Sequence, residues 1–337
     1  MARANTLEII TRLQNEIDNV ISPLLPKQGG FALLDFPNHA NVGDSAIWLG
    51  EIEYFRRQHG VAPNYVSEIE NHNDSELKQA VTKGTIFLHG GGNFGDIWPR
   101  HQQFREKILK EYSEYPIVQL PQSIHFQDPA LLREAARLIN AHPDFTLLVR
   151  DHKSLTIAQA NFTCKIKLCP DMAFALGDLS GQLQPSRQLL LLLRTDSEKQ
   201  ATTGVSSTPT IAEDWLDEDQ AIVEKTRREV MLTLPFKLGF QALKRPRQRE
   251  LLYRRLAEKR VQRGLQQIQS ARFTITDRLH THILSLLSDR NHVALDNNYG
   301  KISNFIAAWT KESQITQQAS TLEAALKLYE SWKNSQV

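Results

Sequence analysis

Short apolar runs alternate with helical patterns along the first half of the chain. The runs are almost continuously apolar, as strands buried on both faces of a sheet should be, at residues 31–35, 85–88, 117–120, 145–149 and 165–168. The clearest helix lies at 128–139, where Asp128 is a good N-cap, Pro129 suits the first turn and apolar residues recur on one face. This alternation predicts an α/β fold with a parallel sheet.

A second α/β unit is predicted in the other half of the chain. Residues 177–185 hold turn formers in place of a periodic pattern and read as a linker. Further strands are expected at 188–193, 272–276 and 292–295, helices at 217–269, 301–309 and 321–332, and a surface loop at 197–215. A prior of about 150 residues per domain suggests two domains for 337 residues, which we place at 1–178 and 186–337.

Polar side chains follow directly on almost every predicted strand. In an open parallel sheet, ligands bind outside the carboxyl ends of the strands, so these residues are candidates for a shared cleft. They are Asn41, Asp44, Gly91, Gly92, Asn93, Gln122, Ser123, Arg150, Asp171, Arg194, Arg278, His280 and Lys301. Helix capping is an alternative explanation for Asp44 and Asp171 taken singly, but it explains the cations poorly.

One glycine-rich segment fits a dinucleotide-binding pattern. The spacing Gly90-x-Gly92-x-x-Gly95 follows an apolar run and is expected to form a turn before a helix. A nicotinamide site also requires an acidic residue after the next strand, whereas the run 117–120 ends in Pro121-Gln122-Ser123. We therefore interpret the segment as a loop that binds an anion or a sugar.

The cations at strand ends indicate the charge of the substrate. Arg and Lys at such positions suit phosphate and carboxylate groups, and several in one cleft would suit a small, multiply charged anion. His280 lies two residues after Arg278, so both side chains can point into one pocket, and this placement favours a catalytic histidine. His280 and His282 lack further ligands at a recognisable spacing, so no metal site is expected.

Composition narrows the class of protein further. The formal net charge of +2 argues against general nucleic-acid binding, and two cysteines, Cys164 and Cys169, fit a reducing compartment. The sequence shows no signal-peptide core and no bilayer-length apolar run, which predicts a cytoplasmic protein. Basic residues gather at 244–263. One interpretation is a solvated helix face; the other is contact with anionic lipid or a pyrophosphate-linked acceptor. The second interpretation would place the protein peripherally at the inner face of the membrane.

Taken in order, these polar clusters resemble the motif series of the polysaccharide pyruvyl transferases. The series covers roughly residues 30–305, and it consists of Asn41-Val-Gly-Asp44, His89-Gly-Gly-Gly-Asn-Phe-Gly95, Pro121-Gln-Ser-Ile124, Val149-Arg-Asp151, Pro170-Asp171, Thr276-Asp-Arg-Leu-His280 and Tyr299-Gly-Lys301. One departure is Pro121-Gln-Ser-Ile-His125, where many members carry Gly-Gln-Ser-Ile-Gly. Residues 197–269 match no motif of the series.

The resemblance implies two Rossmann-like domains facing a cleft, as in GT-B glycosyltransferases, with a C-terminal helix that returns to the first domain. It implies transfer of the enolpyruvyl carbon skeleton of phosphoenolpyruvate to two hydroxyls of one sugar, which gives a pyruvate ketal and phosphate. Phosphoenolpyruvate is then a co-substrate and no cofactor is needed. The acceptor would be a glycan, either free or lipid-linked.

The resemblance also suggests roles for the candidate residues. Arg278 would bind phosphate or carboxylate, His280 would transfer a proton at the enol or the leaving group, and Arg150 or Arg194 would hold the remaining charge. Asn41, Asp44 and the 89–96 loop would hold the sugar, Asp44 or Asp171 would serve as base, and Lys301 would be a further anion ligand. The alternatives are a nucleotide-sugar glycosyltransferase on the same fold and a non-catalytic carbohydrate-binding or lipid-intermediate-binding protein.

Overall fold

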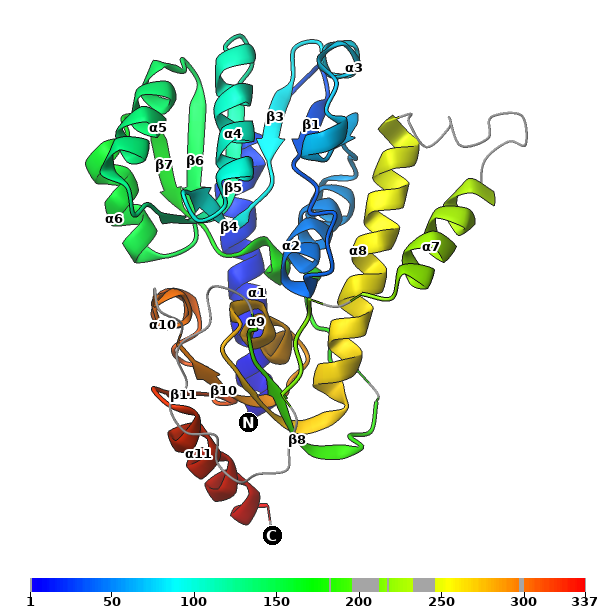
Figure 1. Cartoon of the computed structure of the whole chain (residues 1–337), viewed down its shortest axis with the longest axis vertical. Coiled ribbons are helices and arrows are strands. Elements are labelled where there is room, and N and C mark those ends of the chain that lie inside the picture. Colours follow the sequence, from blue (N-terminus) through cyan, green and yellow to red (C-terminus); the bar gives the residue numbers. More distant parts are fainter. Residues whose placement is uncertain are drawn as a thin grey trace.

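The protein is built on two parallel sheets that lie one beyond the other along its long axis (Figure 1). The computed structural model describes residues 2–181, 183–195, 212–216, 218–232, 246–296 and 300–336. All paired strands in both sheets run parallel, with helices in the connections, which confirms the predicted parallel α/β fold. A GT-B arrangement of two domains stays a prediction.

The first sheet has the strand order β2-β1-β3-β5-β6-β7, and β4 pairs with β5 beside this path. Its strands are β1 (Phe31–Leu34), β2 (Tyr65–Ser67), β3 (Thr85–Leu88), β4 (Gly91–Gly95), β5 (Ile117–His125), β6 (Phe145–Val149) and β7 (Lys165–Leu168). Its helices are α2 (Val42–Glu53), which continues into η2 (Tyr54–Gln58), α3 (Asp74–Ala80), α4 (Pro99–Glu111), α5 (Pro129–Ala141) and α6 (His152–Asn161), with the short turns η1 (Ser22–Leu24), η3 (Ile69–Asn71) and η4 (Met172–Leu176).

Two features of this sheet differ from expectation. The glycine segment forms β4 where a turn into a helix was expected, because β5 continues to His125 and offers Gln122 and Ile124 as pairing partners for Gly91 and Phe94. Strand β7 is the edge of the sheet and alternates between exposed and half-buried residues, so it is not buried on both faces as its apolar run suggested.

The second sheet has the order β11-β10-β9-β8. Its strands are β8 (Arg187–Leu192), β9 (Ala271–Thr276), β10 (Asn291–Leu295) and β11 (Thr316–Ala319), and its helices are α7 (Gln220–Leu232), α8 (Pro246–Gln269), α9 (Leu279–Leu287), α10 (Lys301–Trp309) and α11 (Leu322–Asn334). Strand β11 was missed because Thr316-Gln-Gln-Ala carries almost no apolar signal. The expected helix at 217–269 is represented by two helices, between which residues 233–245 lie outside the described part of the chain.

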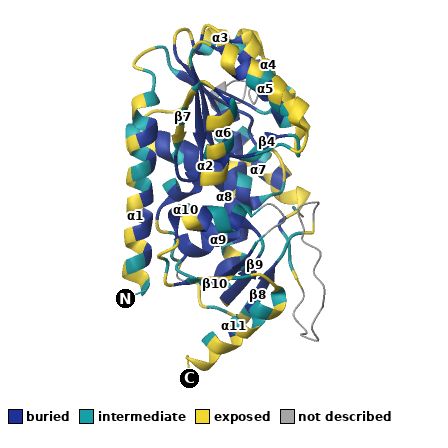
Figure 2. Ribbon diagram, turned by 90° about the vertical axis from the view of Figure 1, so that its left-hand side faces the viewer, coloured by how far each residue is buried: buried dark blue, intermediate teal, exposed yellow. Residues whose placement is uncertain are grey.

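The terminal helix that contacts both halves is at the N-terminus, not at the C-terminus. Helix α1 (Ala2–Ile21) lies alongside both sheets (Figures 1 and 2) and contacts both η4 and α9. Helix α11 stays with the second sheet, where Tyr329 and Trp332 pack on Phe273 of β9. The expected return of the C-terminal helix to the first domain is therefore wrong, because the apolar face of α11 is already buried locally.

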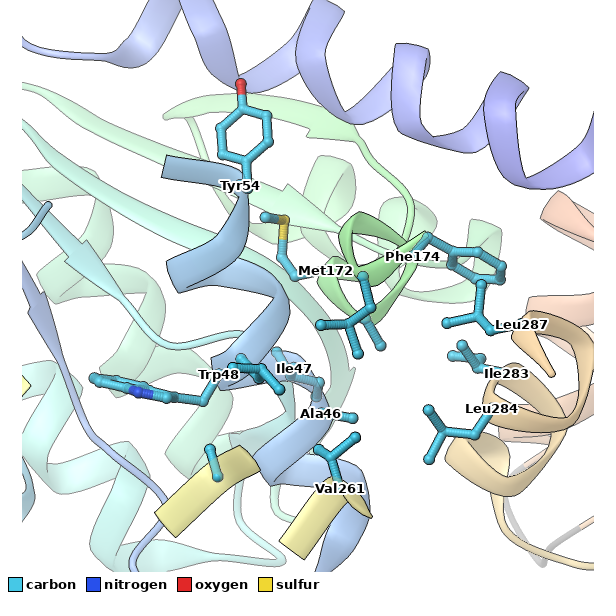
Figure 3. Packing of buried hydrophobic residues seen from close by; sticks show 14 of the residues in the cluster. Ala46, Ile47, Trp48, Tyr54, Met172, Phe174, Val261, Ile283, Leu284 and Leu287 are labelled. Carbon is cyan, nitrogen blue, oxygen red and sulfur yellow. The ribbon is translucent and has the colours of Figure 1, made fainter. Parts of the chain in front are cut away.

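A single apolar cluster joins the two halves. It includes Ala46 and Ile47 of α2, Phe174 of η4, Val261 of α8 and Ile283 of α9, whose side chains converge in Figure 3. Helix α2 reaches this position because Gly50 has no side chain, since an added Cβ would lie 2.0 Å from the carbonyl oxygen of Met172. None of the described helices is both long and apolar enough to cross a bilayer.

Candidate active site

A cavity of about 330 Å³ lies where the carboxyl ends of the first sheet face the start of α9. Most of the candidate residues from the sequence line it, namely Asn41, Asp44, Gly92, Asn93, Arg150, Arg194, Arg278, His280 and Lys301. Both halves of the chain contribute to this set. Residues chosen because they follow predicted strands therefore line one cavity, even when they are as distant in sequence as Asn41 and Lys301.

Arg150 forms a buried ion pair at the floor of the cavity. Its Nη1 donates to Asp171 Oδ2 at 2.6 Å and its Nε donates to Ser123 Oγ at 2.9 Å. His280 Nε2 lies 3.4 Å from the same Asp171 oxygen, and the backbone N–H of Ala173 donates to the other at 2.9 Å. Burial alone would raise the pKa of Asp171, but His280 and Arg150 lower it well below its usual range. Asp171 and Ser123 thus lie behind the cavity and support Arg150.

His280 can reach this position because the second residue of α2 is a glycine. His280 occupies the first turn of α9, and an added Cβ at Gly43 would lie 2.5 Å from its Nδ1. Arg278, the N-cap residue of the same helix, forms an ion pair with Asp214. Gly43 and His280 are therefore one of the places where the two halves meet beside the cavity.

Two cations from different halves converge on the glycine segment. An added Cβ at Gly92 would lie 3.1 Å from Arg150 Nη2 and 3.5 Å from Lys301 Nζ. Gly91 lies beside Asp44, since its added Cβ would be 3.9 Å from Oδ1 of that carboxylate. The glycines thus leave room for the two cations and Asp44 to approach the backbone.

Asp44 lies in the first turn of α2 and is surrounded by histidines. Asn41 caps this helix through the N–H of Gly43 and also donates to Asp44 Oδ2 at 2.8 Å. Burial would raise the pKa of Asp44, but the positive potential of His39, His280 and other histidines lowers it overall. Asp44 and Asp171 are therefore both weak bases.

A buried amide network supports the glycine segment from below. Gln122 Nε2 donates to the carbonyl of His89 at 3.0 Å and to Asn93 Oδ1 at 2.9 Å, and Gln122 Oε1 accepts from the N–H of Asn93 at 3.2 Å. Arg105 donates to Asn93, Gln119 and Gln102, and burial lowers its pKa to about 10. Gln122 thus positions Asn93 and does not line the cavity itself.

Three histidines with carboxylate partners line the cavity, although none of them was assigned a role of its own from the sequence. His89 Nδ1 lies 2.8 Å from Glu51, His101 Nδ1 lies 2.8 Å from Asp35, and His39 Nε2 lies 3.6 Å from Asp44. The position of His39 and His89 just after β1 and β3 was the available signal. Glu51 gave none, because it lies in the last turn of α2 and its partner is remote in sequence.

Trp215, the last residue of the expected 197–215 loop, and the adjacent Leu216 form part of the cavity wall. Trp215 is 1% exposed and its Nε1 donates to Gln267 at 3.0 Å, so this end of the segment is packed and not a surface loop. Leu216 and, on the other side, Trp98 also line the cavity and are about 40% exposed at its mouth. Residues 196–211 lie outside the described part of the chain.

The basic residues of α8 are mostly engaged within the protein. Arg249 pairs with Glu76, Arg254 with Glu250 and Glu258, and Arg260 with Glu218, while Arg263 donates to the carbonyl of Ala40. Helix α8 packs along α2 and β2 in this way. Arg249 and Arg263 thus join the two halves, as does Arg260 through the carbonyl of Pro37, whereas Arg254 pairs within α8. Lys244 and Arg245 lie outside the described residues.

A parallel α/β fold whose strand ends place Arg and Lys side chains and a histidine around one cavity is typical of proteins that act on small anionic substrates. The chain belongs to the polysaccharide pyruvyl transferase family, whose model matches residues 41–299. It is therefore a transferase, and the family points to pyruvyl transfer onto a polysaccharide.

Relatives agree with this family over most of the chain. EpsO of Bacillus subtilis, which is named as a pyruvyl transferase, is 32% identical over 306 residues, covering 89% of this chain and 92% of EpsO. Pyruvyl transferase 1 of Schizosaccharomyces pombe is 26% identical over 328 residues, covering 90% and 76%. A crystal structure of an uncharacterized protein from Klebsiella pneumoniae shares the fold, with a TM-score of 0.59 and 17% identity over 92% of this chain and 99% of that chain.

Proposed function

We propose that the protein transfers the pyruvyl group of phosphoenolpyruvate to two hydroxyls of one sugar, forming a pyruvate ketal and releasing phosphate. The acceptor would be a precursor of an exopolysaccharide or another cell-surface glycan. The observation that carries the proposal is the gathering of Arg150, Arg194, Arg278 and Lys301 in one cavity with His280. A phosphate and a carboxylate on one small molecule need several cations at close range.

The two walls of the cavity suggest where each substrate binds. On the donor side, Arg278, Arg194 and Lys301 would bind the phosphate and carboxylate, and His280, oriented by Asp171, would protonate the enol methylene carbon. On the acceptor side, Asn41, Asp44 and Asn93 offer hydrogen bonds to sugar hydroxyls. Gly91, Gln122 and Ser123 would act by shaping this wall and not by direct contact.

The size of the cavity supports a small donor. Its volume of about 330 Å³ is at the low end of the range of roughly 300–1,000 Å³ for ligand pockets. That space suits phosphoenolpyruvate with one sugar ring better than a nucleotide sugar. No cofactor is required by this chemistry. A lipid-linked acceptor and peripheral membrane contact would be compatible with it, although the described arginines of α8 lend them no support.

The experiment is phosphate release from phosphoenolpyruvate against a panel of hexose and hexosamine acceptors, with thermal shift as a binding assay. We expect phosphoenolpyruvate to raise the melting temperature and UDP and GDP to leave it unchanged. Arg278→Ala should abolish the shift by phosphoenolpyruvate. Stabilisation by UDP or GDP alone would instead support the glycosyltransferase, and near wild-type turnover in both Arg278→Ala and His280→Ala would contradict the assignment of the donor side.

A further inference from the structure

Ketal formation requires a base that none of the cavity carboxylates supplies well. Each of two sugar hydroxyls must lose its proton, while the methylene carbon of the donor gains one and the departing phosphate carries away the other. His280 accounts for the proton on carbon. Asp44 and Asp171 are held ionised by positive neighbours, so they are poor acceptors for a hydroxyl proton.

His89 and Glu51 have the geometry of a base with its orienting carboxylate. Glu51 is fully buried in α2, its Oε2 lies 2.8 Å from His89 Nδ1, and its Oε1 accepts from the N–H of Gly90 at 2.8 Å. Both carboxylate oxygens are therefore fixed. His89 lines the cavity, and with Nδ1 bonded to Glu51, Nε2 is the ring nitrogen left for a substrate.

His39 and His101 are more exposed than His89. The side chain of His101 is 24% exposed, and that of His39 is 47% exposed and lies 3.6 Å from the Asp44 carboxylate. The side chain of His89 is only 3% exposed and packs against the ring of Trp48. Burial alone would lower the pKa of His89, but Glu51, Asp35 and Asp44 together raise it. A raised pKa strengthens His89 as a proton acceptor once it is neutral.

We propose that His89 is the general base that removes the proton from the attacking sugar hydroxyl, with Glu51 as its positioning residue. This inference rests on the proposed function. It places the base on the wall formed by the first sheet and the acid, His280, on the wall formed by α9. Substrates bound between them would have the two proton transfers on opposite sides.

The proposed step balances in atoms and electrons. His89 Nε2 takes the hydroxyl proton as the hydroxyl oxygen forms a bond to C2 of phosphoenolpyruvate, and the electrons of the C2–C3 double bond take a proton from His280 at C3. The bond between C2 and the phosphate oxygen then breaks, its electrons leave with phosphate, and the second hydroxyl oxygen bonds to C2. The second hydroxyl proton leaves as part of hydrogen phosphate. His89 then gives its proton to solvent water and His280 takes one back from it, which regenerates both side chains, and no oxidant or reductant is needed.

The test compares turnover with donor binding in variants of His89 and Glu51. His89→Gln can hydrogen-bond but cannot take a proton, so we expect kcat to fall at least about 100-fold while the thermal shift by phosphoenolpyruvate persists. Glu51→Gln should lower kcat by about 10-fold, because it weakens only the orientation of the ring. Added imidazole should restore part of the turnover of His89→Ala.

A matched control is His142→Gln, because His142 is also buried but precedes β6, at the opposite end of the sheet from the cavity. Its kcat should equal that of the wild type. A His89→Gln variant with kcat within about threefold of the wild type would overturn the proposal. Failure of the proposed function is a separate result, since the wild type itself would then neither bind phosphoenolpyruvate nor release phosphate.

Discussion

At the scale of single residues, the absence of a side chain at Gly43 sets the position of His280. Gly43 has an ordinary backbone conformation, so its role is to leave room and not to permit an unusual φ. The imidazole fills the space that a Cβ would occupy. The position of a proposed acid from one half thus depends on a glycine of the other.

Gly43→Ala tests this dependence. The methyl group must displace His280, so we expect kcat to fall by about 10- to 100-fold, whereas the free energy of unfolding changes by less than about 2 kcal/mol, since alanine favours the helix. Steady-state kinetics and urea unfolding measure the two effects.

Gly60→Ala is the comparison variant, because Gly60 has a φ of 66° and no atoms within 4 Å of an added Cβ. We expect backbone strain of about 1–2 kcal/mol and unchanged kcat. An unchanged kcat in Gly43→Ala would show that His280 tolerates displacement or is not involved in turnover.

At the scale of elements, α9 and β10 are joined by a buried pair of histidines outside the cavity. His282 Nδ1 lies 2.8 Å from His292 Nε2, and the other nitrogens face Thr310 and the carbonyl of Arg290. Burial lowers the pKa of both, that of His292 to about 4, and the positive charge that His292 would carry lowers the pKa of His282 further. The pair is therefore neutral in the folded protein at pH 7.

The neutral pair makes stability depend on pH. Because the unfolded histidines titrate near pH 6.5 and the folded ones at lower pH, the stabilisation is complete above 6.5 and is lost as the pH falls towards 4. We expect the pair to account for a loss of about 2–3 kcal/mol between pH 7.5 and 5.5. Urea unfolding of His282→Leu/His292→Leu at both pH values should show a pH dependence smaller by that amount.

Replacement of the exposed His152 by leucine serves as the control and should leave the pH dependence unchanged. His39, His72 and His142 also have a lowered pKa and add to the slope of the wild type, so only the difference between variants is informative. A double variant with the full wild-type slope would show that the pair does not control it.

The elements also show why the sequence predicted some parts and not others. Strands such as β3 and β6 are buried on both faces and short, so their apolar runs identified them. Strand β5 was ended too early at Leu120, because Pro121 cannot donate a ladder hydrogen bond, yet the strand continues through a shift of register between Gln119 and Gln122. Asp171 and Glu51, the partners of Arg150 and His89, could not be paired with them from the sequence. These contacts depend on how α2 and the segment after β7 pack against the other strands, and no local sequence pattern contains that information.

At the scale of the whole molecule, the two sheets share one core. Leu13 and Ile17 of α1 belong to the same buried cluster as Trp48 of α2 and Leu284 of α9. Helix α1 also makes polar contacts with both halves. Its Asp18 accepts a hydrogen bond from Tyr54 in the first half, and its Arg12 donates to the carbonyl of Trp309 in the second. We therefore expect both halves to unfold together.

Leu13→Ala tests this cooperativity. Removal of a fully buried leucine should lower the free energy of unfolding by about 2–5 kcal/mol and shift one calorimetric transition without splitting it. Leu7→Ala, on the exposed face of the same helix, should cost no more than about 0.5 kcal/mol. Two separate transitions, with one of them insensitive to Leu13→Ala, would show that the halves unfold independently.

Helix α2 fixes the relative positions of several residues at the cavity. Asp44 and Glu51 are seven residues apart, close to two turns of helix, and Gly43 precedes them against His280. Insertion of one residue between Asp44 and Glu51 would rotate the two by about 100° relative to each other. Relatives that catalyse the same reaction should therefore keep the number of residues between positions 43 and 51 constant.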